Sequence, residues 1–298
     1  MLWCYVFMVP AAVLAGLFTF YPMVMSWYYS FLDWTGITVE RTFIGWGNYR
    51  ELIRDPMFWG AFGRSFIFML VGTPVQVGIA LLVAIALNNQ SRRLSAAFRT
   101  LFFLPTVTTV AIVGVVMTSV LSVYHGPANT VLQKLHLIGA PVDFLGDPKL
   151  ALWTVLGVQV WKNVGITMIY WLASLQTVPQ EFYEAARVDG AGRRQILTNI
   201  TIPLLLPFAV IIIVLTANSN LHAFAIVQSM TRGGPYFSTQ VIEVFIYQTA
   251  FVSTDTGGSP RLGYASAAGC LFGIATLFIA LIQAWAARWL ARARRQLR

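Results

Sequence analysis

A cluster of amide, imidazole and aromatic side chains interrupts an otherwise apolar segment, TANSNLHAFAIVQSM. If this segment is helical, Asn218 and His222 share one face, and Asn220, Phe224 and Gln228 share a neighbouring face. Neutral hydrogen-bonding groups beside an aromatic ring suit a polyol or a sugar and lack the fixed charges of an ion pathway. Alternatively, these polar groups bridge packed helices inside a membrane. The pattern therefore predicts either a path for a neutral solute or a structural contact.

A second candidate site is the charged segment VPQEFYEAARVDGAGRRQILTNITIPLLLP, residues 178–207, between two apolar runs. An expected short helix carries Glu184 near its start, where the helix dipole favours acidic side chains. Gly190 can adopt the left-handed conformation that ends a helix, and a second helical piece is expected after it. The small side chains of Ala185 and Ala186, flanked by charges, suit docking into a groove on a partner. A solvated linker between two membrane spans is the alternative.

The composition indicates which kind of structural element holds these two segments in place. Of the 298 residues, 57% are hydrophobic and 10% are charged, whereas soluble domains carry about 25% charged residues. Apolar runs near 20 residues in length predict an all-α polytopic membrane protein in a single domain, residues 1–298. The six expected transmembrane helices are residues 3–31, 62–88, 98–123, 150–175, 203–229 and 263–289.

The basic residues predict the orientation of the chain. The net charge is +9, but the basic residues flank apolar spans and form no stripe with interleaved aromatic residues, so a nucleic-acid partner is not expected. Short basic segments are expected to be cytoplasmic, which places both termini and the loop at residues 177–203 in the cytoplasm. The basic residues of these segments are Arg92, Arg93, Arg99, Arg187, Arg193, Arg194, Arg288, Arg292, Arg294, Arg295 and Arg298.

The sequence offers no set of residues for catalysis. It has no paired nucleophile and base within the spans and no metal-ligand spacing, and Cys4 and Cys270 lie in apolar segments as expected packing residues. Lys162 is expected to extend toward the membrane surface. No phosphate-binding loop is present, so any ATP must be hydrolysed by another chain. These features favour a transport subunit over an enzyme, with no catalytic residue, metal or bound cofactor of its own.

The charged segment closely resembles the EAA motif of bacterial ABC-importer permeases, which consists of Glu-Ala-Ala, three residues, Gly, nine residues, Ile, any residue and Leu-Pro. The matching positions are Glu184, Ala185, Ala186, Gly190, Ile200 and Pro203, with Ile202 in place of the usual leucine. Three other segments resemble the sugar-type permeases related to the maltose and glycerol-phosphate systems. They are FIGWGNYRELIRDPMFWGAF, FRTLFFLPTV and MTRGGPYFSTQVIEVFIYQTAF.

The resemblance implies a type I ABC importer permease fold in the bacterial inner membrane. It implies a heterodimer with a second permease, two ATPase subunits that bind ATP and Mg²⁺, and an extracytoplasmic solute-binding protein. The EAA loop is then the coupling helix, which seats in a cleft on the ATPase. Glu184 and Arg187 are expected to make polar contacts there, Ala185 and Ala186 to allow a close fit, and Gly190 to form the elbow.

The alternative function is a secondary transporter or channel that works alone on a small polar solute. Such a protein is expected to carry acidic residues within the membrane for ion coupling, or an internal repeat. The six expected spans contain no Asp or Glu, and no repeat is found. The sequence therefore favours the permease subunit of an ATP-driven importer for a sugar, a polyol or a glycerol-phosphate-type solute.

Overall fold

The computed structural model describes the backbone of residues 2–88, 92–252 and 259–295 and the side chains of residues 7–88, 95–252 and 259–286. The chain divides into two compact units. Unit 1 comprises Met1–Phe62 and Ile242–Ile279, and unit 2 comprises Gly63–Val241 and Ala280–Arg298. The long helices α4 (Pro56–Asn88) and α14 (Leu262–Arg295) contribute residues to both. The expectation that residues 1–298 form a single domain stays a prediction.

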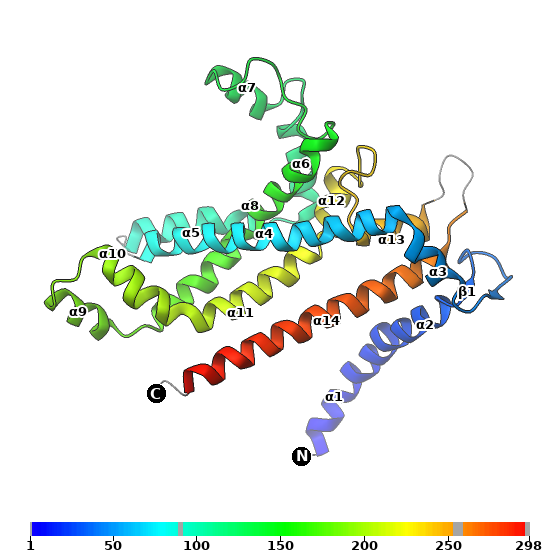
Figure 1. Ribbon diagram of the computed structural model, residues 1–298, viewed down its shortest axis with the longest axis horizontal. Helices are drawn as coiled ribbons and strands as arrows, with labels where there is room; N and C mark the ends of the chain where they lie inside the picture. Colours follow the sequence, from blue (N-terminus) through cyan, green and yellow to red (C-terminus); the bar gives the residue numbers. More distant parts are fainter. Residues whose placement is uncertain (1, 89–91, 253–258, 296–298) are drawn as a thin grey trace. The chain divides into compact units, whose positions relative to one another are not determined.

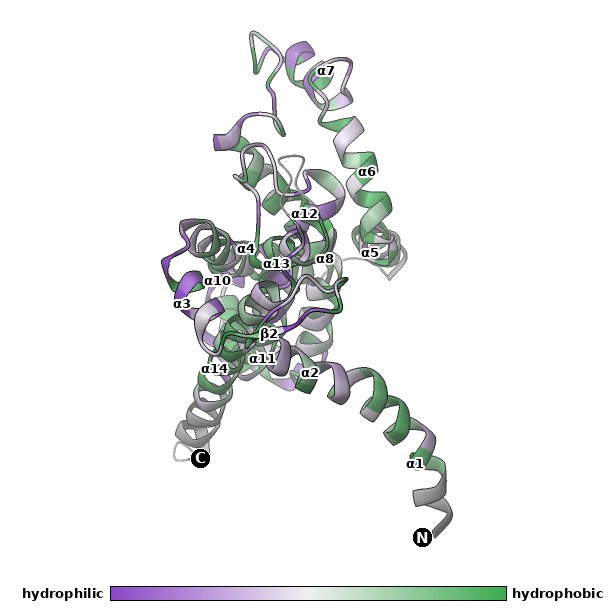
Figure 2. Cartoon of the chain, turned by 90° about the vertical axis from the view of Figure 1, so that its right-hand side faces the viewer, coloured by the Kyte–Doolittle hydropathy of each residue, from purple (hydrophilic) through white to green (hydrophobic). Residues whose placement is uncertain are grey.

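Unit 1 begins with a continuous helical stretch that leads into a short hairpin (Figure 1). The stretch consists of α1 (Leu2–Ala15), a π-helical turn η1 (Gly16–Phe20) and α2 (Tyr21–Tyr29). A two-residue hairpin follows, β1 (Leu32–Asp33) paired antiparallel with β2 (Thr42–Phe43), and then α3 (Gly47–Arg54), α13 (Ile242–Phe251) and the start of α14. Figure 2 shows the N-terminal stretch largely in the hydrophobic colour, as expected for a helix surrounded by lipid.

A buried amide fixes the turn that follows α2. Asn48 is almost fully buried, and its Nδ2 donates hydrogen bonds of 2.9 Å to the carbonyl oxygens of Ser30 and Leu32. The hydroxyl of Tyr49 donates to Ser30 Oγ at 2.8 Å. These bonds satisfy backbone acceptors at the end of α2 that the helix itself cannot satisfy, so α3 is held against the turn.

Unit 2 is organised around α8 (Pro148–Gln176), which packs against α5 (Arg92–Val107) and α11 (Ile202–Leu221). Its other elements are α6 (Val110–Val120), α7 (Pro127–Lys134), α9 (Gln180–Val188), α10 (Arg193–Ile196), the π-helical turn η2 (Leu197–Thr201) and α12 (Phe224–Met230). Gly165 lets α5 approach closely, because a Cβ at this position would lie 2.9 Å from the Cα of Phe103. Met168 and Trp171 form the buried side of α8.

Among the described residues, four helices are long and apolar enough to cross a membrane, and a bent pair makes a fifth if it is one span. The four helical stretches are Phe7–Tyr29, Pro56–Asn88, Arg193–Leu221 and Leu262–Ala286. The predicted all-α membrane class is therefore confirmed, whereas the count of six spans is not. The expected span 150–175 is present as α8, but it carries the buried polar side chains Gln159 and Lys162 and is not among the four.

The expected span 98–123 is not one straight helix. Ser95–Val107 and Val110–Val120 meet at an angle of 99°. The freed carbonyls near the end of α5 find partners, because Thr108 Oγ1 donates to the Leu104 oxygen at 3.2 Å and Lys162 Nζ donates to the Thr106 oxygen at 3.4 Å. A break inside a membrane is tolerated when such groups are satisfied by the protein. Lys162 is thus buried rather than extended to the surface, contrary to expectation.

The expected span 203–229 is also interrupted. Helix α11 ends at Leu221, His222 has φ −95° and ψ 71°, and α12 starts at Phe224. The apolar run from which the span was predicted does not reveal this break. Cys270 is buried, as expected. The side chains of Cys4, Arg92 and Arg93 and of the basic C-terminal tail lie outside the described residues.

Candidate functional site

The glycine elbow of the charged loop is confirmed by the backbone geometry. Helix α9 is followed by Gly190 with φ +77°, in the left-handed region. The amide of Ala191 donates to the Ala186 oxygen at 2.9 Å, and the amide of Gly190 donates to the Arg187 oxygen at 3.1 Å. This pair of bonds is the Schellman motif, which satisfies carbonyls at a helix end. A Cβ at Gly190 would meet nothing within 4 Å, so the requirement for glycine there is one of backbone conformation.

The second helical piece of the loop is also confirmed, and it continues without interruption into a long helix. The Gly192 amide donates to Gln195 Oε1 at 2.8 Å, which caps the start of α10. From Arg193 the chain stays helical through α10, η2 and α11 as far as Leu221. The second piece of the loop and the long apolar helix are therefore one continuous helical stretch, Arg193–Leu221.

The structure separates the two alanines of the loop. Glu184, Ala185 and Arg187 are exposed, whereas Ala186 is only 8% exposed. Only Ala185 therefore presents a small side chain on the exposed surface of α9. Ala186 is instead buried, a distinction that the sequence motif does not reveal.

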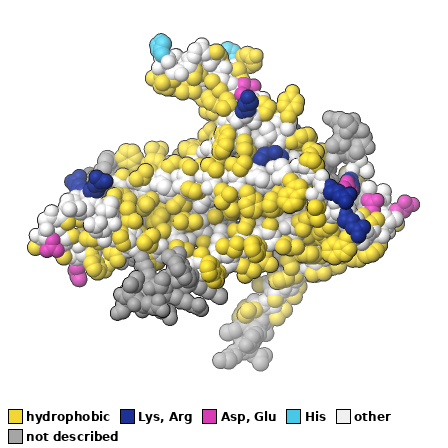
Figure 3. All heavy atoms as spheres, viewed as in Figure 1, with side chains coloured by type: hydrophobic (Ala, Val, Ile, Leu, Met, Phe, Trp, Pro, Cys, Tyr) yellow, Lys and Arg dark blue, Asp and Glu magenta, His cyan; other side chains and the backbone are white. Residues whose placement is uncertain are grey.

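The charged loop encloses a cavity of about 830 Å³ at the end of unit 2. Near it, the Thr201 hydroxyl lies 3.5 Å from the hydroxyl of Tyr183, which links η2 to α9. Figure 3 shows basic and acidic side chains at the end of this unit, next to a largely hydrophobic surface. The lining residues are Ile85, Asn88, Leu175, Gln176, Val178, Gln180, Tyr183, Glu184, Arg187, Ala191, Arg193, Ile196, Leu197 and Thr201.

The second candidate site, the polar cluster near α11, contains a buried network centred on Asn220. Asn220 is 0% exposed, and its Nδ2 lies 3.1 Å from Gln76 Oε1 and 3.3 Å from Thr73 Oγ1. Gln76 Nε2 in turn donates to Thr167 Oγ1 at 2.8 Å and to the Asn163 oxygen at 3.1 Å. These contacts join α4, α8 and α11. The sequence predicted a polar role for Asn220 but missed Gln76, whose signal was a lone amide inside an apolar span.

The other members of the cluster do not share a face with Asn220. Asn218 and His222 are exposed, and Phe224 and Gln228 are partly exposed. Because α11 ends at Leu221, the expected i, i+4 relation between Asn220 and Phe224 is not formed. Among the described residues, Gln228 Oε1 is buried without a hydrogen-bond partner. The cluster therefore divides into a buried anchor at Asn220 and a set of accessible groups beside the helix break.

Comparisons with known proteins agree on the family to which this chain belongs. Residues 64–296 match the model of a family described as binding-protein-dependent transport system inner membrane component. The chain is 33% identical to "Probable ABC transporter permease protein YurN" of Bacillus subtilis, covering 94% of each chain. It is 32% identical to the lactose transport system permease protein LacF of Rhizobium radiobacter, covering 95% of this chain and 93% of LacF.

A solved structure has the same fold. It is a bacterial ABC transporter involved in the import of the acidic polysaccharide alginate, with a TM-score of 0.81 and 24% sequence identity. The match covers 96% of this chain and 94% of the other.

We predict that Asn220→Leu destabilises the protein by about 1–3 kcal/mol, because Gln76 Oε1 and Thr73 lose a buried donor. Thermal unfolding of the detergent-solubilised protein measures the effect. The matched control is Asn218→Leu, on the same helix but exposed, which should change stability by less than about 0.5 kcal/mol. Equal unfolding temperatures for the two variants would show that the network does not hold the helices together.

Proposed function

We propose that this chain, which belongs to the family of binding-protein-dependent transport system inner membrane components, is the permease subunit of an ATP-driven importer for a sugar or a related polyol or glycerol-phosphate solute. As a permease it is a transport subunit and not an enzyme, and it is an integral membrane protein. The relative named for lactose transport supports a carbohydrate as the solute. The neutral hydrogen-bonding groups beside the break in α11 support it as well.

The observation that carries the proposed mechanism is the connection of the charged loop to α11. An exposed charged helix, α9, is anchored by Ala186 and stopped by the left-handed Gly190, and the chain is then helical to Leu221. In our proposal Glu184 and Arg187 contact an ATPase subunit, and Ala185 permits its close approach. Closure of the ATPase dimer displaces α9 and α10, and the helix transmits this displacement to the region of Asn218 and His222.

The proposed assembly contains a second, homologous permease, two ATPase subunits and an extracytoplasmic solute-binding protein. ATP and Mg²⁺ bind to the ATPase subunits and not to this chain. We propose six spans, counting α8 and the bent pair α5 and α6, in the bacterial inner membrane with both termini in the cytoplasm. The basic residues near the charged loop support this orientation, because cytoplasmic loops are enriched in Lys and Arg.

We place the solute path at the accessible polar groups around the break between α11 and α12. Discontinuous membrane helices commonly line substrate sites, since their freed polar groups face a cavity. Asn218, His222, Phe224 and Gln228 are the candidate contacts, and Asn220 is the anchor behind them. A transporter that works alone is less well supported, because the four apolar helices contain no acidic residue from which ion coupling could be built.

The coupling proposal predicts that Gly190→Val uncouples ATP hydrolysis from transport. Valine at φ +77° is strained, and a residue with a Cβ in this conformation costs roughly 1–2 kcal/mol, so α9 is displaced while the membrane helices remain folded. Solute uptake and binding-protein-stimulated ATPase activity are measured in the reconstituted complex. Uptake should fall by about fivefold to thirtyfold, the range that corresponds to a strain of this size.

Gly192→Val is the matched control for the loss of coupling. Gly192 lies two residues away and is equally exposed, but its φ of −71° and ψ of 164° suit any residue. Its Cβ would meet Gln195 at an ordinary 3.7 Å. The control should transport normally. Normal uptake by Gly190→Val, or equal loss in both variants, would contradict the elbow mechanism.

The path proposal predicts that His222→Leu lowers uptake per assembled complex by between a few-fold and about a hundredfold. The range follows from the roughly 0.5–3 kcal/mol lost when a hydrogen-bonded group is removed or left unpaired. Uptake is divided by the amount of complex extracted in detergent. The solute affinity of the isolated binding protein should not change. Normal uptake per complex in both His222→Leu and Asn218→Leu would contradict this proposal. It would indicate that the solute path lies on other helices or on the partner permease.

A further inference from the structure

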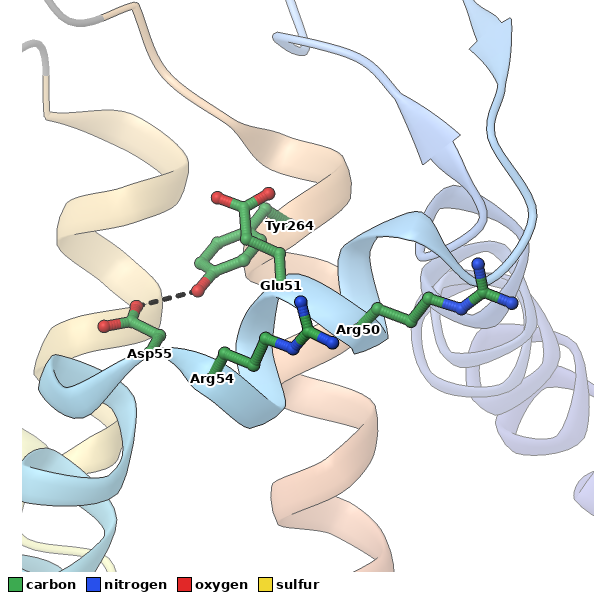
Figure 4. A pocket seen from close by; sticks show the side chains of 5 residues that line it. All are labelled: Arg50, Glu51, Arg54, Asp55 and Tyr264. Atoms are coloured by element: carbon green, nitrogen blue, oxygen red, sulfur yellow. Dashed lines mark hydrogen bonds between the residues drawn. The ribbon is translucent and has the colours of Figure 1, made fainter.

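A charged pocket in unit 1 is independent of both sites described above. It has a volume of about 440 Å³ and is lined by Arg50, Glu51, Arg54, Asp55 and Tyr264. Four of these residues lie on or directly after α3, and Tyr264 lies in the first turn of α14 (Figure 4). The pocket therefore joins the short helix α3 to the start of a long apolar helix.

The two carboxylates of the pocket already have partners. Glu51 forms a bidentate pair with Arg261, with both N–O distances 2.6 Å. This hydrogen bond holds the pKa of Glu51 below its usual value, so the pair stays ionised at neutral pH. Asp55 Oδ2 accepts a hydrogen bond of 2.7 Å from the Tyr264 hydroxyl, and Asp55 Oδ1 accepts one of 2.8 Å from the Met57 amide at the start of α4.

The two arginines of the pocket, in contrast, have no charged partner among the described residues. Arg50 and Arg54 are exposed and four residues apart on α3. Within the described part of the chain, neither guanidinium group forms a hydrogen bond or an ion pair. Figure 4 shows both side chains extending in the same direction along α3, away from the Asp55–Tyr264 hydrogen bond. The pocket therefore presents two positive charges to one region of space.

The pocket lies where two long apolar helices begin. Two helices that are long and apolar enough to cross a membrane begin at Pro56 and at Leu262, directly after Asp55 and Arg261, so the pocket lies at the end of both. Two large apolar side chains close in sequence to Arg54 are exposed: Ile53 is 59% exposed and Trp59 is 50% exposed. Tryptophan beside basic residues on a short amphipathic helix is typical of the membrane interface.

We propose that Arg50 and Arg54 bind the phosphate of an anionic phospholipid headgroup, with the lipid's apolar part against Ile53 and Trp59. Guanidinium groups bind phosphate oxygens through paired hydrogen bonds. A free anion would need the two arginines but not the exposed apolar side chains around them. The combination of charge and apolar rim favours a lipid.

The test uses a photoactivatable phosphatidylglycerol added to the purified transport complex, with the labelled peptides identified by mass spectrometry. Labelling is expected in the segment from α3 to the start of α4. An exposed ion pair changes binding by up to about fivefold. Arg50→Gln and Arg54→Gln should therefore each lower this labelling about fivefold, and the double variant more. Photoactivatable phosphatidylcholine should label the segment weakly in every variant.

Arg41→Gln is the matched control, because Arg41 is an exposed cation of the same unit that stacks on Trp34 at 4.3 Å and does not line the pocket. It should label like the unaltered protein. Unchanged labelling in the double variant would overturn the proposal. So would suppression of labelling by millimolar inorganic phosphate, which would indicate a free-anion site. Loss of stimulation by the binding protein with unchanged labelling would instead identify a protein-docking surface.

Discussion

The structure of unit 2 depends on one constraint: polar groups that are removed from water must find partners within the protein. Asn220 Nδ2 and the Gln76 side chain meet this constraint together, and in doing so they join α11 to α4 and α8. Among the described residues, Asn220 Oδ1 is buried without a hydrogen-bond partner. At the other irregular point, Thr108 and Lys162 donate to carbonyls that the end of α5 leaves free. Both helix interruptions of this unit therefore lie next to buried polar contacts, which makes interrupted helices compatible with an apolar surrounding.

The same network is connected to the charged loop through α11. Helix α11 is fixed near its end by Asn220, and the chain between Arg193 and this anchor is helical throughout. In the proposed mechanism, this helical connection carries movement of the loop toward the interruption at His222. A loop with the same sequence on a flexible connection would lack this property. The family to which the chain belongs performs transport, and this connection is a physical route by which transport can be driven from outside the membrane.

Local signals explain what the sequence predicted. A glycine after a charged, alanine-containing helix predicts a left-handed helix end, and Gly190 adopts that conformation. The features that were missed depend on contacts between residues far apart in the sequence. The partner of Asn220 is 144 positions away, and Lys162 is buried because the end of α5 offers it a carbonyl. The division of Ala185 and Ala186 into an exposed and a buried residue is set by how α9 packs, which no motif encodes.

The proposed mechanism requires direct contact between α9 and an ATPase subunit. A photoreactive amino acid at Val188, which is 88% exposed on α9, measures this contact in the assembled complex without altering Glu184 or Arg187. The same residue at Leu137, which follows α7 and is also exposed, is the comparison. The account predicts a covalent adduct between position 188 and the ATPase subunit and none from position 137. Adducts of position 188 with lipid alone, or with the ATPase from both positions equally, would contradict it.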